Sequence, residues 1–336
     1  MSPSVSILIP AFNQELRFLK ECIDSALNQT LRDIEVVVSD NHSSNGTAEF
    51  LTSYSDERLR IVAPETFLSM NDNFAFCASH ARGKFISFLS SDDVLLPHAI
   101  RTLYDHIDRH PQIVFGCGNI YSARRFPSDS NRTRFLIRAH GKRVRSFSPE
   151  EARGVFFPWT MASTWMAGNI IRRDAYEKTG GFSRCDMLTT GDVWLTKMLL
   201  EQGGFFCLDE PLALFRTRSL LKTEVDRDRR LFDFTDLLSS QAREGARAPT
   251  AWRRFRQNAS LAYRLGAAPQ PSVEALRRSR EALVALSRHD LVRLVDRQLA
   301  NDIALRVVGW TLSLLNLARM SIQRTRSHFR SARSAR

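Results

Sequence analysis

Two adjacent aspartates, Asp92 and Asp93, follow an apolar run over residues 85–89 after two serines. Neighbouring carboxylates repel each other unless a positive charge neutralises them. Mg²⁺ and Mn²⁺ prefer oxygen ligands and keep coordination positions for substrate phosphates. The pair therefore predicts a divalent-metal site facing a phosphate-bearing ligand. The alternative is that the two carboxylates only cap the helix that follows.

Polar residues also end two earlier strand-like runs. Asn13 follows the run 5–10, and Asp40 follows the β-branched run 33–39. The carboxyl ends of parallel strands meet at one edge of a sheet, so we expect Asn13, Asp40 and the aspartate pair to converge there. The alternative for Asp40 is an ordinary polar turn.

Strand-like runs alternate with segments of helical spacing over the first two-thirds of the chain. The expected strands are 5–10, 33–39, 59–63, 84–89, 113–121, 167–172 and 205–208. The expected helices are 15–28, a segment from Thr47, 73–81, 97–110, 174–179 and 192–202. This alternation predicts the α/β class, with a mostly parallel central sheet flanked by helices. Residues 122–150, rich in Arg, Ser and Pro, are expected to leave the sheet and line the acceptor side.

The composition changes near residue 220, which predicts one domain over 1–219 and an Arg-rich helical extension over 220–336. Residues 241–336 hold 19 Arg, no Lys and 6 acidic residues, whereas the whole chain has a net charge of +12. The basic charge therefore belongs to the extension. An apolar helical stripe that includes Trp310 precedes the last arginines. An anionic membrane surface would suit such a stripe, and a packed helical subdomain or an oligomerisation surface are the alternatives.

The sequence also argues against several classes of protein. No uninterrupted apolar run reaches the roughly 18–20 residues of a membrane-spanning helix, and the start of the chain lacks a basic leader region. The five cysteines are widely spaced without a C-x-x-C pair, which favours reduced thiols. We therefore expect a cytoplasmic protein, with peripheral attachment to the inner face of the membrane as the finer hypothesis.

Several segments in order resemble the family-2 glycosyltransferases over roughly residues 4–216. They are 5–13 (VSILIPAFN), 22–30 (CIDSALNQT), 38–47 (VSDNHSSNGT), 81–93 (ARGKFISFLSSDD), 167–173 (AGNIIRR), 180–182 (GGF) and 211–216 (PLALFR). The resemblance implies a GT-A fold, which is Rossmann-like. It also implies transfer of a sugar from a nucleotide-sugar donor, expected to be UDP-linked, with inversion at the anomeric carbon.

The resemblance also implies roles for individual residues. Those expected to bind the nucleotide are Asp40 at the base, Pro10, Phe12 and Asn13 in the adjacent wall, and Asn73, Arg82, Ser91 and Asp92. Ser90 replaces the first carboxylate of the family's D-x-D motif. Asp93 is then the expected metal ligand, with Asp92 beside the ribose or a metal-bound water.

An inverting transfer needs a general base within reach of the acceptor hydroxyl. The family places this base in a Glu-Asp pair that opens a helix, and here Asp192 stands in that region without the glutamate. Asp192 is the expected catalytic base, with Asp186 as the second choice. The alternative is that Asp192 only caps its helix. The residues expected near the acceptor or the diphosphate are Trp159, Trp165, Asn169 and Arg216.

Together these features predict a metal-assisted glycosyltransferase of cell-surface polysaccharide biosynthesis that acts on a glycan or lipid-linked acceptor. The first alternative is an inert nucleotide-sugar-binding scaffold, because Ser90 and the missing glutamate depart from the family pattern. A nucleic-acid-binding protein would use the basic extension, but no aromatic-interleaved basic motif is present, and we expect no nucleic-acid partner. A nucleotidyltransferase would need a phosphate-cradling Gly-rich loop, which residues 10–14 do not form. The sequence predicts no oligomeric state.

Overall fold

The computed structural model describes residues 2–123, 133–135, 144–151, 167–185, 191–216 and 272–299, together with 231, 235, 238 and 261. The chain divides into two compact units. The first comprises Met1–Asp186 and Gly191–Arg218, and the second comprises Met187–Thr190 and Ser219–Arg336. The first unit carries the sheet and every candidate site residue that the structure describes.

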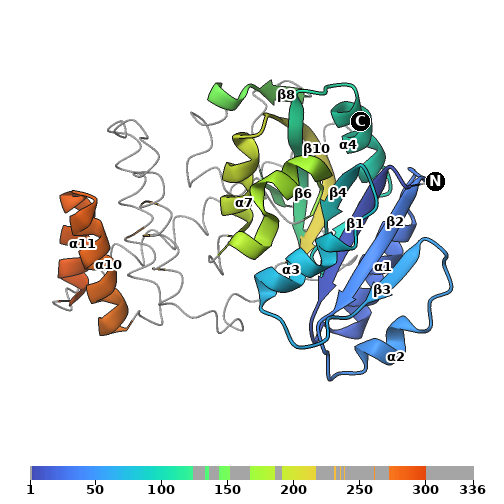
Figure 1. The fold of residues 1–336 in the computed structure, drawn as a ribbon, viewed down its shortest axis with the longest axis horizontal. Helices are drawn as coiled ribbons and strands as arrows, with labels where there is room; N and C mark the ends of the chain where they lie inside the picture. Colours follow the sequence, from blue (N-terminus) through green and yellow to red (C-terminus); the bar gives the residue numbers. More distant parts are fainter. Residues whose placement is uncertain are drawn as a thin grey trace, which may run out of the picture. The chain divides into compact units, whose positions relative to one another are not determined.

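The described strands of the first unit form one sheet in the order β3-β2-β1-β4-β9-β6-β10-β5. The strands are β1 (Val5–Ala11), β2 (Ile34–Asp40), β3 (Leu59–Val62), β4 (Phe85–Phe88), β5 (Val94–Leu95), β6 (Ile113–Ala123), β7 (Thr133–Phe135), β8 (Val144–Phe147), β9 (Asn169–Arg172) and β10 (Gly204–Arg216). The pairs among β3, β2, β1 and β4 are parallel, as is the β6–β10 pair, whereas β9 runs antiparallel to both of its neighbours. The predicted α/β class is confirmed. In Figure 1 the N terminus lies near one end of β1 and β2, and α2 lies beyond the opposite end.

Helices cover both faces of this sheet (Figure 1). They are α1 (Leu16–Leu27), α2 (Thr47–Leu51), α3 (Met70–Ser79), α4 (Ala99–Asp108), α6 (Arg173–Thr179) and α7 (Gly191–Leu200), with a short 3-10 helix at Gly181–Arg184. The buried residues of α1 and α4 pack with Ile7 and Ile9 in one core cluster. On the other face an aromatic cluster joins α3 to β4, with Phe74 and Phe182 each within 6 Å of a ring neighbour.

The central strands are apolar along most of their length because both faces are covered. Every residue of β1 and β2 is buried, and their register pairs Val5 with Ile34 and Ala11 with Asp40. A continuous apolar run is typical of such parallel strands, because no position faces water. The register sets the carboxyl ends of β1 and β2 side by side, and this edge carries the candidate site.

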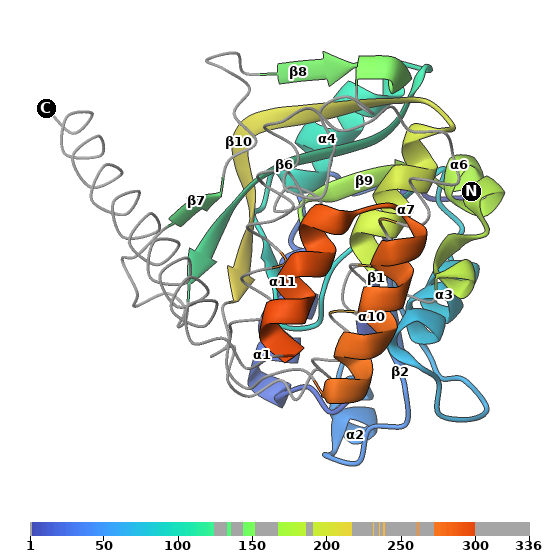
Figure 2. The ribbon, with the colours of Figure 1, turned by 90° about the vertical axis from the view of Figure 1, so that its left-hand side faces the viewer.

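The prediction that residues 122–150 leave the sheet is wrong for two described segments. β7 pairs with β6, and β8 pairs with β10. Phe147 of β8 is buried against Phe205, so burial of an aromatic side chain overrides the polar composition around it. β10 is also longer than the predicted strand, because it continues through bulges around Pro211 as far as Arg216, and Figure 2 shows its bend.

In the second unit the structure describes the helices α10 (Val273–Ala285) and α11 (His289–Leu299), which lie side by side in Figure 2. Ser272 caps α10 by accepting a hydrogen bond from the Ala275 N–H. Leu276, Leu283, Leu291 and Val295 belong to a core of their own. The Trp310 stripe and the last arginines lie outside the described residues. No described helix is both long enough and apolar enough to cross a bilayer.

Candidate active site

The loop after β1 is locked to the loop after β2 at the carboxyl edge of the sheet. The Asn13 N–H donates to Ser43 Oγ at 2.8 Å, and Asn13 Oδ1 accepts from the Ser44 N–H at 2.8 Å. Asn13 has a φ of 46°, a left-handed conformation that asparagine tolerates better than most residues. Pro10 lies in β1 itself, and Phe12 extends from the loop as an exposed side chain.

Asp40 ends β2 beside this loop. Its Oδ1 accepts from the Ser43 N–H at 3.2 Å, and no hydrogen bond joins Oδ2 to any described residue. Asn73 of α3 bridges the two strand ends below Asp40. Asn73 Oδ1 accepts from Ser39 Oγ at 2.6 Å, and Asn73 Nδ2 donates to the Ala11 carbonyl at 3.4 Å. Asn73 is buried, so its amide positions the strands that carry Asp40 and Asn13.

The Ser90–Asp93 turn follows β4 at the same edge, next to β1. The Leu89 N–H donates to the Leu8 carbonyl at 2.9 Å, and the Asp93 N–H closes the turn onto the Ser90 carbonyl at 2.9 Å. Asp93 is only 1% exposed, and its Oδ1 accepts from the Arg216 N–H at 2.9 Å. Asp92 is partly exposed. The two carboxylates therefore occupy different environments, although they are adjacent in sequence.

Gln14 connects this turn to the loop after β1. Ser91 Oγ donates to Gln14 Oε1 at 3.4 Å, and Asn45 Nδ2 donates to the Gln14 carbonyl at 2.7 Å. The ends of β1, β2 and β4 thus form one hydrogen-bonded edge. The structure brings together Asn13, Asp40, Asp92 and Asp93, as the strand-end argument predicted, and Ser91 lies on the same turn as the two aspartates.

Arg216, at the end of β10, holds the turn from behind. Its Nε donates to the Asp92 carbonyl at 2.9 Å, and one terminal nitrogen donates to Glu21 Oε2 at 2.6 Å. The guanidinium also lies 3.8 Å from the ring centroid of Phe18 on α1. Arg216 is 3% exposed, so the prediction that it contacts the acceptor or the diphosphate is corrected. Arg216 is a positioning residue for the aspartate turn.

Cys22 lies beneath the same turn. Its Sγ donates to the Ser90 carbonyl at 3.4 Å, and the thiol is buried. Burial raises the pKa of Cys22 well above its ordinary value, and the negative charges of Asp93 and Asp92 raise it further. The thiol therefore stays neutral and acts as packing for the turn.

Asp192 lies in the first turn of α7, and it is partly exposed. The preceding Gly191 packs closely on α3, because a Cβ built there would lie 3.2 Å from Asn71 Oδ1. Asn71 stands at the start of α3, and its Nδ2 donates to the Cys185 carbonyl at 2.7 Å. Since α3 starts at the carboxyl edge, α7 also begins there. Asp186 lies outside the described residues.

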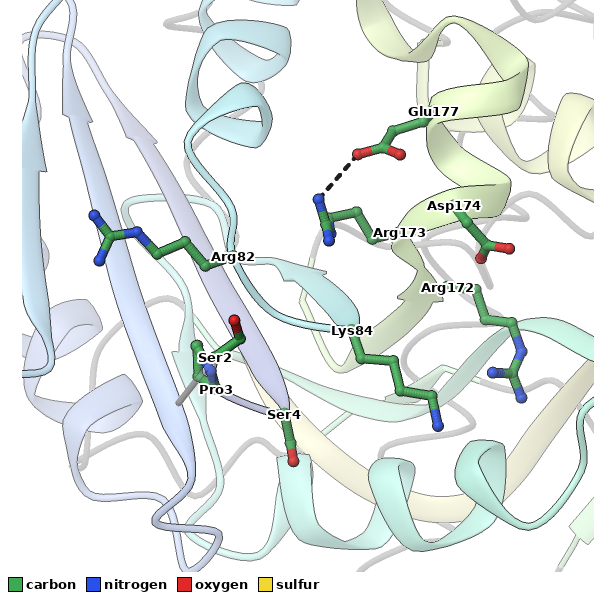
Figure 3. Close-up of a pocket in the computed structure, with 9 residues that line it drawn as sticks. All are labelled: Ser2, Pro3, Ser4, Arg82, Lys84, Arg172, Arg173, Asp174 and Glu177. Atoms are coloured by element: carbon green, nitrogen blue, oxygen red, sulfur yellow. Dashed lines mark hydrogen bonds and ion pairs between the residues drawn. The ribbon is translucent and has the colours of Figure 1, made fainter.

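The structure contradicts the nucleotide-binding role predicted for Arg82. Its N–H donates to Glu35 Oε1 at 2.6 Å and to Ser6 Oγ at 3.2 Å, before β4 begins. This is the amino edge of the sheet, opposite the aspartate turn. Figure 3 shows Arg82 there in a shallow pocket with Lys84 and Arg172. The resemblance implied the nucleotide-binding role, but Arg82 precedes β4 and the aspartate turn follows it, so the two lie at opposite ends of that strand.

The acceptor-side prediction for Asn169 is also corrected. Asn169 is buried in β9, where its Nδ2 donates to the Phe88 carbonyl at 2.9 Å and its Oδ1 accepts from the Phe88 N–H at 3.1 Å. Its amide thus continues the sheet next to β4. Trp159 and Trp165 lie outside the described residues.

A divalent metal fits this edge only if its ligand shell is shared with a substrate. Among the described residues no group of three or more His, Cys, Asp and Glu side chains could hold a metal ion. Asp92 and Asp93 supply at most two carboxylates, and Asp93 is engaged by Arg216. Mg²⁺ and Mn²⁺ commonly take one or two protein carboxylates and complete their shell with substrate phosphates and water. The donor set therefore suits a metal that arrives with a diphosphate.

Three further residues support this edge and were not predicted from the sequence: Glu21, Gln14, and Asn41, whose side-chain amide bonds to the backbone of Leu68. Each acts through a contact distant in sequence, so no local motif marked them. In the sequence, these three residues are marked only as polar residues next to the apolar positions of a helix or strand, and this pattern does not identify their partners.

Comparison with known proteins identifies the family to which this chain belongs. The sequence profile described as Glycosyl transferase family 2 matches residues 6–180, more than half of the chain. One relative is the GalNAc(5)-diNAcBac-PP-undecaprenol beta-1,3-glucosyltransferase of Campylobacter jejuni, which is 32% identical over 117 residues, 34% of this chain and 38% of that protein. The alignments with the first curated relatives span between 34% and 39% of those proteins' own length.

Solved structures share the fold. The S. aureus TarS structure in complex with UDP-GlcNAc has a TM-score of 0.60 at 17% identity, covering 93% of this chain and 92% of that one. The mannosyltransferase PcManGT of Pyrobaculum calidifontis, in complex with GDP-Man and Mn²⁺, has a TM-score of 0.51 at 17% identity, covering 97% of this chain and 88% of that one. The expected GT-A-like architecture is confirmed.

Proposed function

Because the chain belongs to glycosyl transferase family 2, we propose that it moves a sugar from a nucleoside-diphosphate donor to a hydroxyl of a glycan or lipid-linked acceptor, with inversion. The observation that carries the proposal is the convergence of Asp40, Asn13 and the Ser90–Asp93 turn at one edge of the sheet. A UDP-linked donor and a place in cell-surface polysaccharide biosynthesis are the finer parts of this proposal.

The donor would lie across the carboxyl ends of β1, β2 and β4. Asp40 has an oxygen without a described partner, and an ionised carboxylate oxygen can accept from a base N–H or a ribose hydroxyl. Asn13 and Phe12 stand beside it on the loop after β1. Ser91 and Asp92 lie on the neighbouring turn, at the position that the ribose and diphosphate would occupy.

Asp92 would be the main protein ligand of a divalent metal in this site. The burial of Asp93 and its bond to the Arg216 N–H make Asp93 the support of the turn, so the metal role we had predicted for it passes chiefly to Asp92. When bound, such a metal would neutralise charge that develops on the diphosphate leaving group. Arg216 holds the main-chain carbonyl of Asp92 and thereby restrains the backbone that carries this carboxylate.

Asp192 is the proposed general base. In a single in-line displacement the acceptor oxygen forms a bond to the anomeric carbon as the bond to the diphosphate oxygen breaks. The acceptor proton passes to the Asp192 carboxylate. Its place in the first turn of α7, at the edge where α3 also begins, supports this role.

The test is release of nucleoside diphosphate from a panel of nucleotide sugars, with and without glycan and lipid-linked acceptors. Asp192→Asn should slow transfer by about 10²–10⁴-fold, because it removes a positioned base. Donor binding, measured by titration, should persist. A matched control is Asp174→Asn, an exposed aspartate in the first turn of α6. Normal transfer by Asp192→Asn would refute the assignment, and no release from any donor would favour the inert scaffold.

The basic extension is proposed to hold the protein at an anionic membrane from the cytoplasmic side, where a lipid-linked acceptor would lie. The concentration of arginine in residues 241–336 supports this. The full chain should float with vesicles that contain anionic lipid, and high salt should release it. Equal flotation with neutral vesicles would contradict the electrostatic part of the proposal.

A further inference from the structure

Two aromatic side chains lie exposed beside the strand end that carries Asp40. Phe12 is 47% exposed and Phe67 is 60% exposed. Their ring centroids are 5.0 Å apart with an interplanar angle of 61°, an edge-to-face arrangement. Large apolar side chains gathered on a surface mark binding sites more often than isolated ones do. Phe12 belongs to the loop after β1, whereas Phe67 belongs to the loop between β3 and α3.

The loop that carries Phe67 is fixed to the end of β2. Asn41, the residue after Asp40, is buried, and its side-chain amide makes two hydrogen bonds to the backbone of Leu68. Asn41 Nδ2 donates to the Leu68 carbonyl at 2.9 Å, and the Leu68 N–H donates to Asn41 Oδ1 at 2.9 Å. His42 Nε2 donates to the Pro64 carbonyl at 3.0 Å. The position of the Phe67 backbone is therefore set by the two residues that follow Asp40.

The other end of this loop is anchored as well. Ser69 caps α3 by accepting from the Asp72 N–H at 3.2 Å, and Asn73 of the same helix bonds to Ser39 and Ala11. Both flanks of Phe67 are thus tied to the strand ends of β1 and β2. A rigid backbone that presents an exposed ring lowers the entropy cost of binding a flat ligand against it.

We propose that Phe67 binds the nucleobase of the donor, with the base lying against the Phe12–Phe67 pair while Asp40 Oδ2 accepts one of its N–H groups. This inference rests on the proposed function and adds a base-binding residue to it. The pairing of an aromatic surface with a carboxylate oxygen that no described residue occupies fits a base, which has both a π-face and N–H donors. A purely apolar lipid chain would use the rings but not the carboxylate.

The test compares Phe67→Ala with Ile61→Ala, which truncates another apolar side chain, 45% exposed, on the adjacent strand β3. UDP, GDP and CDP are titrated with Mn²⁺ into the wild-type chain, and the tightest of them is used for the variants. Inorganic pyrophosphate with Mn²⁺ serves as a ligand without a base. Both truncated side chains are exposed, so we expect both variants to fold, and thermal melting checks this.

Phe67→Ala should weaken nucleoside diphosphate binding about tenfold, the usual scale for losing one aromatic platform. Pyrophosphate binding should not change, Phe67→Trp should retain affinity, and Ile61→Ala should match the wild type. Unchanged nucleotide affinity in Phe67→Ala overturns the inference, and a raised KM for the acceptor alone would assign the ring to the acceptor. A wild-type chain that binds none of the nucleotides would refute the proposed function itself, and this inference with it.

Discussion

Arg216 shows how one buried side chain sets the geometry of the candidate site. It joins Glu21 of α1, the Asp92 carbonyl and, through its backbone N–H, the Asp93 carboxylate. The resemblance to family-2 glycosyltransferases implied a basic residue near the diphosphate at this position. The fold instead buries Arg216 against Glu21 of α1, which lies 195 residues earlier in the sequence. Such a partner cannot be read from local spacing.

Replacing this residue should destabilise the fold as well as the site. Arg216→Met leaves Glu21 without its buried partner and should lower the free energy of unfolding by about 2 kcal/mol, the scale of hydrogen bonds to charged groups. Arg17→Met is the matched control, because Arg17 pairs with the same Glu21 from an exposed position, and exposed pairs contribute about 0–1 kcal/mol. Urea unfolding followed by circular dichroism measures both. Equal effects of the two substitutions would contradict the role assigned to Arg216.

At the scale of elements, a second buried carboxylate ties three strands together at the amino edge. Glu35 of β2 accepts from Ser6 Oγ of β1 at 2.6 Å and from a terminal nitrogen of Arg60 on β3 at 2.9 Å. Burial by itself would raise the pKa of Glu35, but the hydrogen bonds from Ser6, the Arg82 N–H and Arg60 outweigh it and hold the pKa below its ordinary value. The charged form of Glu35 therefore stabilises the folded state.

The lowered pKa of Glu35 makes the stability of the fold depend on pH in a defined direction. A carboxyl group whose folded pKa lies below its unfolded pKa contributes stability above the unfolded value, near 4.3 for glutamate, and loses it as the pH falls through the folded value. Glu35→Gln should therefore cost about 1–2 kcal/mol at pH 7 and little at pH 3. Glu177→Gln, which breaks an exposed pair on α6, should cost little at either pH. Urea unfolding at both pH values measures this, and a pH-independent cost of Glu35→Gln would contradict it.

The strand ends could be predicted because parallel strands alternate with helices, and apolar runs that end in polar residues mark their carboxyl ends. Asn13, Asp40 and Asp92 were found in this way. Arg82 was misplaced because its role came from the resemblance alone, whereas a residue that precedes a strand lies at the amino end of that strand. β7 and β8 were missed because their pairing partners, β6 and β10, supply the stability that their own composition lacks.

At the scale of the whole molecule, the first unit carries the proposed chemistry and the second carries most of the positive charge. The profile of family 2 covers residues 6–180, and the net charge of +12 comes from the residues beyond 240. The change of composition near residue 220 is where we expect the boundary between a catalytic domain and the helical extension.

The central claim is that the carboxyl edge binds a nucleoside diphosphate together with a divalent metal held chiefly by Asp92. Isothermal titration of UDP into the full chain, with Mn²⁺ or with EDTA, tests it most directly. We predict binding with Mn²⁺, loss of binding with EDTA, and affinity weakened on the order of tenfold or more in Asp92→Asn, while Asp174→Asn binds like the wild type. UDP affinity that is the same with EDTA and in Asp92→Asn would contradict the account.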